Sequence, residues 1–290
     1  MIKTFPAKLL LFGEYSVLAG SDACAFPLDL FSGSLALPGS KDIISESLAA
    51  SNVNIKLLAA YLTEPDNLRT AAEILDLDRL AADIGAGLAF QSDIPQNYGV
   101  GSSGALVAAI FNAYQKKDRA SDIQSLRTHL AFIESAFHST SSGTDPLVSY
   151  LRKPVFISKG KVTCPDLTLK EVRRHISIDL IDSGIPGATL TGIETFQSDF
   201  IQKTAEKHFF EREYIPLINS LTNDILSSSY DGLMDKVFRV SEMQLQLFPH
   251  LFTKGMSALA REGIDSGEFA IKLCGSGGGG FYLKICAARL

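Results

Sequence analysis

The segment 96–110 combines small residues with the start of an apolar run, reading Gln-Asn-Tyr-Gly-Val-Gly-Ser-Ser-Gly-Ala-Leu-Val-Ala-Ala-Ile. Its glycines allow tight turns and let a ligand approach the backbone closely. Either of its serines, Ser102 or Ser103, can cap the helix that is predicted to follow. Because a helix start offers unpaired N–H groups and a partial positive charge, the segment predicts a phosphate site, most simply that of a nucleotide.

Three other interpretations of this segment have to be weighed. Gly99 to Gly104 matches the dinucleotide fingerprint G-x-G-x-x-G, but that fingerprint follows a buried strand, and Pro95 is a poor strand residue. The P-loop pattern is absent, because the only Gly-Lys pair, Gly160-Lys161, is followed by valine. The remaining alternative is a glycine-rich helix entry that binds no ligand.

Glu134 is a candidate ligand for a cation. The segment 122–138 has the apolar periodicity of an amphipathic helix, and Glu134 shares a row of i, i+4 positions with Leu130 and His138. A carboxylate at the edge of the apolar stripe must find a partner, or its burial costs free energy. It therefore either turns out to solvent or binds a cation.

Three further features carry chemistry. Lys8 lies in a predicted N-terminal strand and is either a strand-edge charge or a functional cation. Asp145 precedes a proline in a polar run, where an aspartate often sets a turn. The segment 275–280 holds five glycines in six residues, more than a hairpin needs, which indicates backbone packed against another loop or a ligand.

The elements that must position these residues follow from periodicity and from turn signals. Short strand-like pieces are expected over 14–31, and a helix or a strand over 77–90. A domain boundary near 165–172 separates domains 1–168 and 169–290. The predicted helices are 51–62, 67–75, 103–117, 122–138, 194–207, 211–227, 230–246 and 251–262. The predicted strands are 2–12, 154–157, 161–164, 175–182, 269–273 and 281–286.

Composition limits the class of protein. The 290 residues are 46% hydrophobic, which is ample for a core. A net charge of −5 gives no footprint for nucleic acid or an anionic membrane. The four cysteines form no C-x-x-C pair and the histidines no H-x-x-x-H, so neither zinc nor a disulfide framework is expected, and a cytoplasmic location fits. The apolar run 9–12 is too short for a leader or a membrane span.

Three motifs, in order, resemble those of the GHMP kinases. The first is a lysine before an apolar strand and a Gly-Glu-Tyr turn, at 7–18 as Ala-Lys-Leu-Leu-Leu-Phe-Gly-Glu-Tyr-Ser-Val-Leu. The second is a proline followed by Gly-x-Gly-Ser-Ser, at 95–105. The third is Lys-Leu-x-Gly-Ser-Gly-Gly-Gly-Gly, at 272–280. One motif alone is weak, but three at these separations make the resemblance span nearly the whole chain.

Within this superfamily the segment 134–145 is most similar to the mevalonate kinases, including the spacing from its glutamate to its aspartate. Ser139 and Ser141 stand where that pattern usually has glycine and proline. Tyr15 replaces a histidine and matches some phosphomevalonate kinases. The forms of 94–104 and 145–149 resemble a short bacterial branch of the mevalonate kinases.

The resemblance implies an α+β GHMP kinase fold, with a ribosomal-protein-like N-terminal domain and a ferredoxin-like C-terminal domain. It also implies ATP and Mg²⁺ as cofactors. Asp145 would accept the proton of the substrate hydroxyl, with Lys8 close to it, and Glu134 and Ser103 (or Ser102) would hold Mg²⁺. The implied phosphate-binding residues are Tyr98, Gly99, Val100, Gly101, Ser102, Ser103 and Gly104. Residues implied to contact substrate or support the loops are Glu14, Thr189, Gly275, Ser276, Gly277 and Gly278.

The function implied is ATP-dependent phosphorylation of the primary hydroxyl of mevalonate, for isoprenoid synthesis. The alternative is a phosphomevalonate kinase or another small-molecule GHMP kinase, for which Lys153, Lys159 and Arg174 are candidate contacts to an extra phosphate. A third hypothesis is a non-catalytic sensor that binds a metabolite and signals to a protein partner. A homodimer is an expectation of the family.

Overall fold

The protein is represented by a computed structural model that describes residues 3–37, 45–116, 122–138, 141–187 and 204–288. The chain divides into two compact units. The first unit comprises Met1–Lys8, Pro27–Ile94 and Gly101–Arg152, and the second comprises Leu9–Phe26, Pro95–Val100 and Lys153–Leu290. These compact units do not test the predicted boundary between domains 1–168 and 169–290, which stays a prediction.

Five strands form the first sheet, in the order β1-β2-β4-β5 with β3 also paired to β2. The long strand β2 pairs antiparallel with β3, and Gly33 lies opposite Ser92. Strands β4 and β5, which correspond to the predicted strands 154–157 and 161–164, pair antiparallel as a hairpin. The bounds are β1 Phe5–Phe12, β2 Ala23–Ala36, β3 Ala89–Ser92, β4 Val155–Ser158 and β5 Lys161–Thr163.

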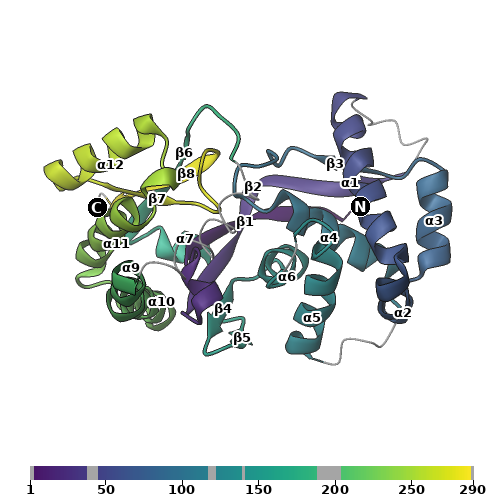
Figure 1. The fold of residues 1–290 in the computed structure, drawn as a ribbon, viewed down its shortest axis with the longest axis horizontal. Coiled ribbons are helices and arrows are strands. Elements are labelled where there is room, and N and C mark those ends of the chain that lie inside the picture. Colours follow the sequence, from purple (N-terminus) through teal and green to yellow (C-terminus); the bar gives the residue numbers. More distant parts are fainter. Residues whose placement is uncertain (1–2, 38–44, 117–121, 139–140, 188–203, 289–290) are drawn as a thin grey trace. The chain divides into compact units, whose positions relative to one another are not determined.

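The core of the first unit contains α4, most of whose residues are buried. Helices α5 and α6 pack against it, and α1 packs on β3 (Figure 1). The segment 77–90 contains both of its expected alternatives, since α3 is followed by β3. The bounds are α1 Ser45–Thr63, α2 Pro65–Ile74, α3 Leu77–Gly85, α4 Ser102–Tyr114, α5 Ile123–Glu134 and α6 Thr144–Leu151.

Three local expectations are corrected in the first unit. No serine caps α4 in the described structure, because its N-cap is Gly101 in a left-handed conformation (φ 78°). Helix α5 ends at Glu134, so His138 lies beyond it. The polar run before Pro146 ends in a helix: α6 begins at Thr144, because proline is tolerated in a first helical turn and an aspartate there is stabilised by the helix dipole.

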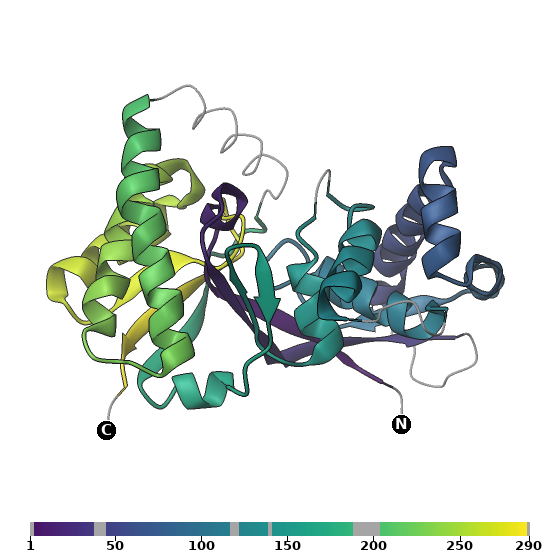
Figure 2. The same ribbon diagram turned by 90° about the horizontal axis from the view of Figure 1, so that it is seen from below.

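The second unit contains an antiparallel sheet of order β6-β8-β7. Helices α11 and α12 pack on β7, and Ser241 of α11 donates to the Ile271 carbonyl at 2.6 Å. Segments α9, η2 and α10 follow one another directly along the chain (Figure 2). Two 3-10 helices, η1 Ser16–Ala19 and η3 Pro249–Leu251, and one π-helix, η2 Phe210–Tyr214, are described in this unit. The other bounds are α7 Leu169–Val172, β6 Ile176–Asp182, α9 Thr204–Phe209, α10 Ile215–Ser227, α11 Leu233–Leu247, α12 Lys254–Ser266, β7 Ala270–Leu273 and β8 Phe281–Ala287.

The strand-like pieces expected over 14–31 are wrong at η1, which is a 3-10 helix. The other predicted elements of this unit agree in type with the structure, within a few residues at their ends. Most of the helix predicted over 194–207 lies outside the described residues, and only its end, within α9, is seen. Helices and antiparallel sheets together give the predicted α+β class.

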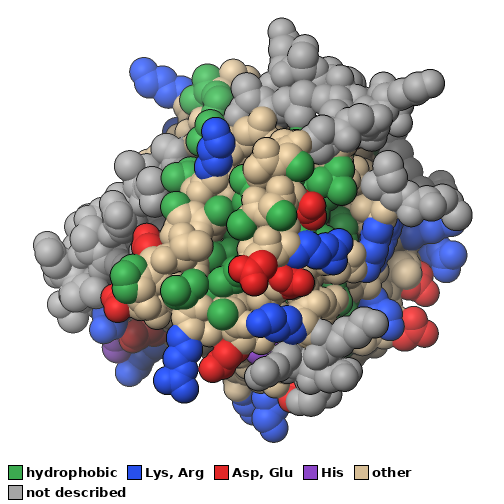
Figure 3. Space-filling model, turned by 90° about the vertical axis from the view of Figure 1, so that its right-hand side faces the viewer, with side chains coloured by type: hydrophobic (Ala, Val, Ile, Leu, Met, Phe, Trp, Pro, Cys, Tyr) green, Lys and Arg blue, Asp and Glu red, His purple; other side chains and the backbone are tan. Residues whose placement is uncertain are grey.

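The surface around α1, α2 and α3 mixes side chains of every kind (Figure 3). Val53 and Leu57 of α1 and Leu68 of α2 are exposed apolar residues in these helices. Scattered apolar side chains are normal on a folded protein, so they do not identify a partner surface. The expected homodimer stays a prediction. Among the described helices, none combines the length and the hydropathy that a membrane crossing requires.

Candidate active site

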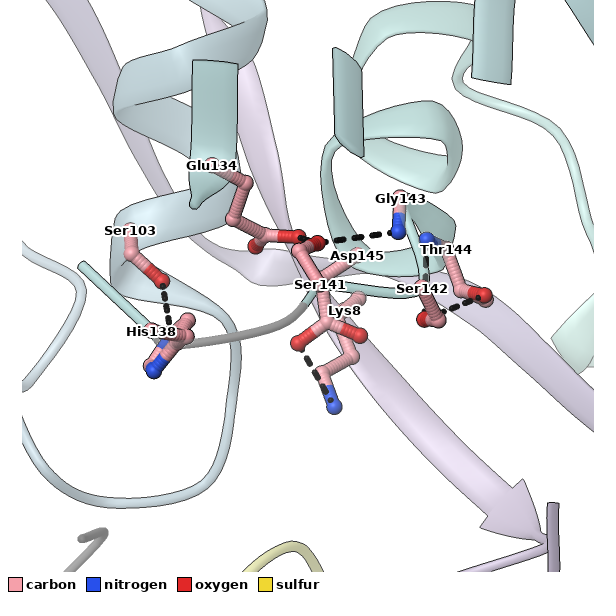
Figure 4. A network of polar contacts seen from close by, with 9 residues as sticks. All are labelled: Lys8, Ser103, Glu134, His138, Ser141, Ser142, Gly143, Thr144 and Asp145. Carbon is pink, nitrogen blue, oxygen red and sulfur yellow. Dashed lines mark hydrogen bonds and ion pairs between the residues drawn. The ribbon is translucent and has the colours of Figure 1, made fainter. Parts of the chain in front are cut away.

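Lys8 and Asp145 form an ion pair inside the first unit. The Lys8 Nζ lies 3.0 Å from the Asp145 Oδ2, and only 6% of the Lys8 side chain is exposed (Figure 4). Lys8 is therefore not a solvated charge at a strand edge, and a lysine this buried needs a partner. The proximity of these two residues, implied by the family resemblance, is confirmed.

The first turn of α6 presents Asp145. The helix begins after Gly143, which has φ 70°, and a Cβ there would lie 2.9 Å from that of Ala131. A glycine is thus needed where the chain turns close to α5. Ser149 of α6 donates to the Pro6 carbonyl of β1 at 2.8 Å. This bond holds α6 against the strand that carries Lys8.

Glu134, at the end of α5, is buried rather than turned to solvent. The Ser141 hydroxyl donates a hydrogen bond to its Oε2 (Figure 4). Burial first, and then the charge of Asp145, raise the pKa of Glu134 to about 8, while Ser141 and Lys8 act in the opposite direction. A carboxylate in this position is electrostatically suited to a neighbouring cation.

Ser103, in the first turn of α4, lies 3.4 Å from the Nε2 of His138 (Figure 4). Burial lowers the pKa of His138, although the nearby Asp145 opposes this effect. The neutral imidazole is therefore favoured, and in its Nδ1-protonated tautomer it accepts the Ser103 proton. His138 was not among the predicted site residues, although its i, i+4 relation to Glu134 was visible.

The glycines at the start of α4 make room for the ion pair. A Cβ at Gly101 would lie 2.7 Å from the Lys8 Cγ, and one at Gly104 would lie 2.9 Å from the Asp145 Cβ. Both distances are too short for non-bonded carbons. The segment must therefore be glycine-rich where it passes Lys8 and Asp145.

In the second unit, Tyr98 and Gly99 pack against the glycines of the segment 275–280. A Cβ at Gly275 would lie 2.7 Å from the Gly99 Cα, and one at Gly280 would lie 2.6 Å from the Tyr98 Cα. The Phe281 N–H donates to the Tyr98 carbonyl at 3.2 Å. The sequence-based expectation that these glycines pack against another loop is confirmed.

A buried ion pair anchors this second loop. Lys272 of β7 pairs with Glu14, and both side chains are almost completely buried. The Tyr15 hydroxyl donates to the Ser276 carbonyl, and the backbone of Tyr15 has a positive φ of 60°. Glu14 was among the predicted site residues, whereas Lys272 was named only as the first residue of the motif 272–280. The signal was available, since each is a charged residue at the end of an apolar strand segment.

The oxygen atoms of the first unit fit a hard cation. The described residues contain no cluster of three or more His, Cys, Asp or Glu side chains that would hold a metal alone. Magnesium needs no such cage, because it commonly binds through one or two carboxylates and the phosphates of a nucleotide. The Glu134 carboxylate and the hydroxyl of Ser103 (or of Ser102) are ligands of this kind.

Comparison with known proteins identifies the superfamily. Residues 67–153 match the family described as GHMP kinases N terminal domain. A mevalonate kinase of Thermococcus sibiricus is 23% identical over 314 residues, covering 100% of this chain and 90% of the relative. The comparisons thus agree with the resemblance to the GHMP kinases that the three sequence motifs indicate.

Solved structures with the GHMP kinase fold cover the whole chain. The L. major mevalonate kinase in complex with R-mevalonate has a TM-score of 0.67 at 15% identity, covering 100% of this chain and 88% of the other. The Streptococcus pneumoniae phosphomevalonate kinase, in complex with phosphomevalonate and AMPPNP, has a TM-score of 0.62 at 12% identity, covering 100% and 93%. GHMP kinases are small-molecule kinases that use ATP as phosphate donor. Of the predicted site residues, Thr189 alone lies outside the described residues.

Proposed function

We propose that this GHMP kinase transfers the γ-phosphoryl group of ATP to the primary hydroxyl of mevalonate. The observation that carries the kinase part of the proposal is the Lys8–Asp145 ion pair at the head of α6, with the buried Glu134 beside it. The acceptor is supported by the relatives, since seven curated relatives that match this chain are named mevalonate kinase.

Asp145 is the proposed base. Its carboxylate would accept the proton of the acceptor hydroxyl as the hydroxyl oxygen forms its bond to the γ-phosphorus and the bond from that phosphorus to ADP breaks. Lys8, 3.0 Å from the Asp145 Oδ2, would offer positive charge to the phosphoryl oxygens in flight. Phosphoryl transfer depends more on such positioning and charge neutralisation than on covalent chemistry by the protein.

The nucleotide phosphates would bind to the backbone N–H groups between Tyr98 and Gly104, where α4 begins without a side-chain cap in the described structure. Glu134 and Ser103 would hold Mg²⁺, which would neutralise charge on the phosphates. Their oxygen atoms and the burial of Glu134 fit this role. The glycines at 275–280, locked against Tyr98 and Gly99, would support the phosphate-binding backbone.

The second candidate is a phosphomevalonate kinase, which the sequence suggested through Tyr15. In the structure the Tyr15 hydroxyl bonds the Ser276 carbonyl, and burial raises the pKa of Tyr15. This tyrosine is thus explained by loop support and needs no phosphorylated acceptor. We therefore rank mevalonate first.

A coupled assay of ADP release, with mevalonate, phosphomevalonate, homoserine and galactose as acceptors, tests the assignment. We expect turnover with mevalonate and at least a hundred-fold lower kcat/KM, about 3 kcal/mol, for the other acceptors. Preference for phosphomevalonate would replace the first candidate by the second. Nucleotide binding without turnover of any acceptor would favour a non-catalytic sensor.

The variant Asp145→Asn separates an enzyme from a sensor. We expect it to retain nucleotide binding and to lose about 10³-fold or more in kcat, because its amide cannot accept the proton. Turnover retained by this variant would exclude Asp145 as the base.

A further inference from the structure

Ser141 occupies an unusual position in this site. It stands where the mevalonate kinase pattern usually has a proline, which has no hydroxyl, and its own hydroxyl contacts Glu134. The Gly143 N–H donates to the Ser141 Oγ at 2.9 Å (Figure 4). This chain therefore has a link that a proline could not make.

The direction of these hydrogen bonds is determined by their chemistry. The Ser141 oxygen accepts from the Gly143 N–H, and the Ser141 hydroxyl donates its single proton to the Oε2 of Glu134. Gly143 is the N-cap of α6, two residues before Asp145. The carboxylate of Glu134 is in this way connected to the helical turn that carries Asp145.

Glu134 needs such a partner. Its polar side chain is buried at the end of α5, where an unpartnered carboxyl group would cost free energy. A donated hydrogen bond favours the ionised form and restricts the carboxylate to one orientation. Partners that orient a metal-binding carboxylate commonly contribute strongly to metal affinity.

We propose that Ser141 is a positioning residue that holds the Glu134 carboxylate, relative to Asp145, in the orientation required to bind a divalent cation with the nucleotide. This inference rests on the proposed function, in which Glu134 is a ligand of that cation. It assigns to Ser141 a task that is specific to this chain and that proline-bearing relatives must accomplish differently.

Ser142 provides a matched control. It is the next residue, has the same side chain, and also supports the start of α6, but through Thr144: its Oγ lies 2.9 Å from the Thr144 Oγ1, and the Thr144 N–H donates to it at 3.3 Å. Replacing either serine by alanine removes one hydroxyl from this turn. Only Ser141→Ala removes the donor to Glu134.

The experiment measures Mn²⁺ binding to the full chain in the presence of ADP, from the electron paramagnetic resonance signal of free Mn²⁺. We expect Ser141→Ala to weaken Mn²⁺ affinity about 10- to 100-fold, Ser142→Ala to change it less than about two-fold, and Ser141→Thr to restore it. Thermal unfolding in EDTA verifies that all variants are folded.

Equal affinities in Ser141→Ala and the wild type, or equal losses in the two alanine variants, would overturn the inference. So would a wild-type protein that binds no Mn²⁺ with ADP. The acceptor assignment is judged separately: if mevalonate is not turned over but Ser141→Ala still weakens Mn²⁺ binding selectively, the proposed acceptor fails and the positioning role stands.

Discussion

Replacing Glu134 by glutamine tests the electrostatics of the site through protein stability, without an activity assay. Glutamine has nearly the same shape and can still accept the hydrogen bond from Ser141, but it cannot ionise. In the wild type, burial and the charge of Asp145 raise the pKa of Glu134 to about 8. The variant removes this perturbed titration and changes little else.

The sign follows from proton binding. Between the pKa of an unfolded glutamate, 4.5, and the folded pKa of about 8, the folded protein holds a proton that the unfolded chain has released. The free energy of unfolding contributed by Glu134 therefore falls as the pH rises through this window. At about 1.4 kcal/mol per pH unit, the loss from about pH 5 to about pH 8 is at most about 4 kcal/mol.

The assay is urea unfolding of wild type and Glu134→Gln in EDTA, at about pH 5 and about pH 8. We expect the variant to gain stability relative to the wild type by about 1–4 kcal/mol between these conditions, since the other titrating groups are shared. Glu262→Gln, on the exposed surface of α12, is the control and should follow the wild type.

Two results of these unfolding measurements bear on the role of Glu134. If the free energies of unfolding of Glu134→Gln and wild type differ by the same amount at both pH values, burial and the charge of Asp145 do not raise the pKa of Glu134. If magnesium and ADP stabilise the wild type at about pH 8 but not the variant, the same carboxylate also contributes to cation binding, because a ligand that binds only the folded state raises its stability.

Other predictions concern packing and charge around the two loops. Lys8→Met should lower kcat by about 10²–10³ with little change in nucleotide affinity, as measured by steady-state kinetics and calorimetry, and an unchanged kcat would exclude a catalytic role for this lysine. Gly104→Ala places a Cβ 2.9 Å from that of Asp145, so we expect kcat to fall about 10²-fold while the circular dichroism spectrum stays native; a normal kcat would mean that α6 can shift freely. Lys272→Met removes the cation that pairs with the buried Glu14, and we expect it to lower the free energy of unfolding in urea by about 3–5 kcal/mol. The double variant with Glu14→Gln should recover part of that loss. If the double variant is no more stable than Lys272→Met, loss of the ion pair is not the cause.

The amino-acid sequence determined which chemistry this protein carries. Glycine and serine before an apolar run, a lysine in the first strand and an aspartate after a polar run are recognisable locally, because each residue type has few physical uses in such surroundings. Their order along the chain was sufficient for the superfamily. Most helices and strands were also predictable, since their periodicity reflects burial of one face.

The start of α6 was not predictable in this way. Asp145-Pro146 has the local chemistry of a turn and equally that of a first helical turn, and the choice depends on contacts with β1 and α5. The cap of α4 is similar: Ser103 had the right side chain, but it contacts His138 instead.

Only the tertiary structure decided how the charges meet. Glu134 at the edge of an apolar stripe could turn either way, and in its buried position it accepts a hydrogen bond from Ser141, which belongs to a different segment. Lys8 pairs with Asp145, and Lys272 with Glu14, across long stretches of chain. The local sequence shows that a charged residue lies among apolar ones and that burying its charge would cost free energy. The partner that offsets this cost comes from a segment that is distant along the chain, so only the packing of the folded protein identifies it.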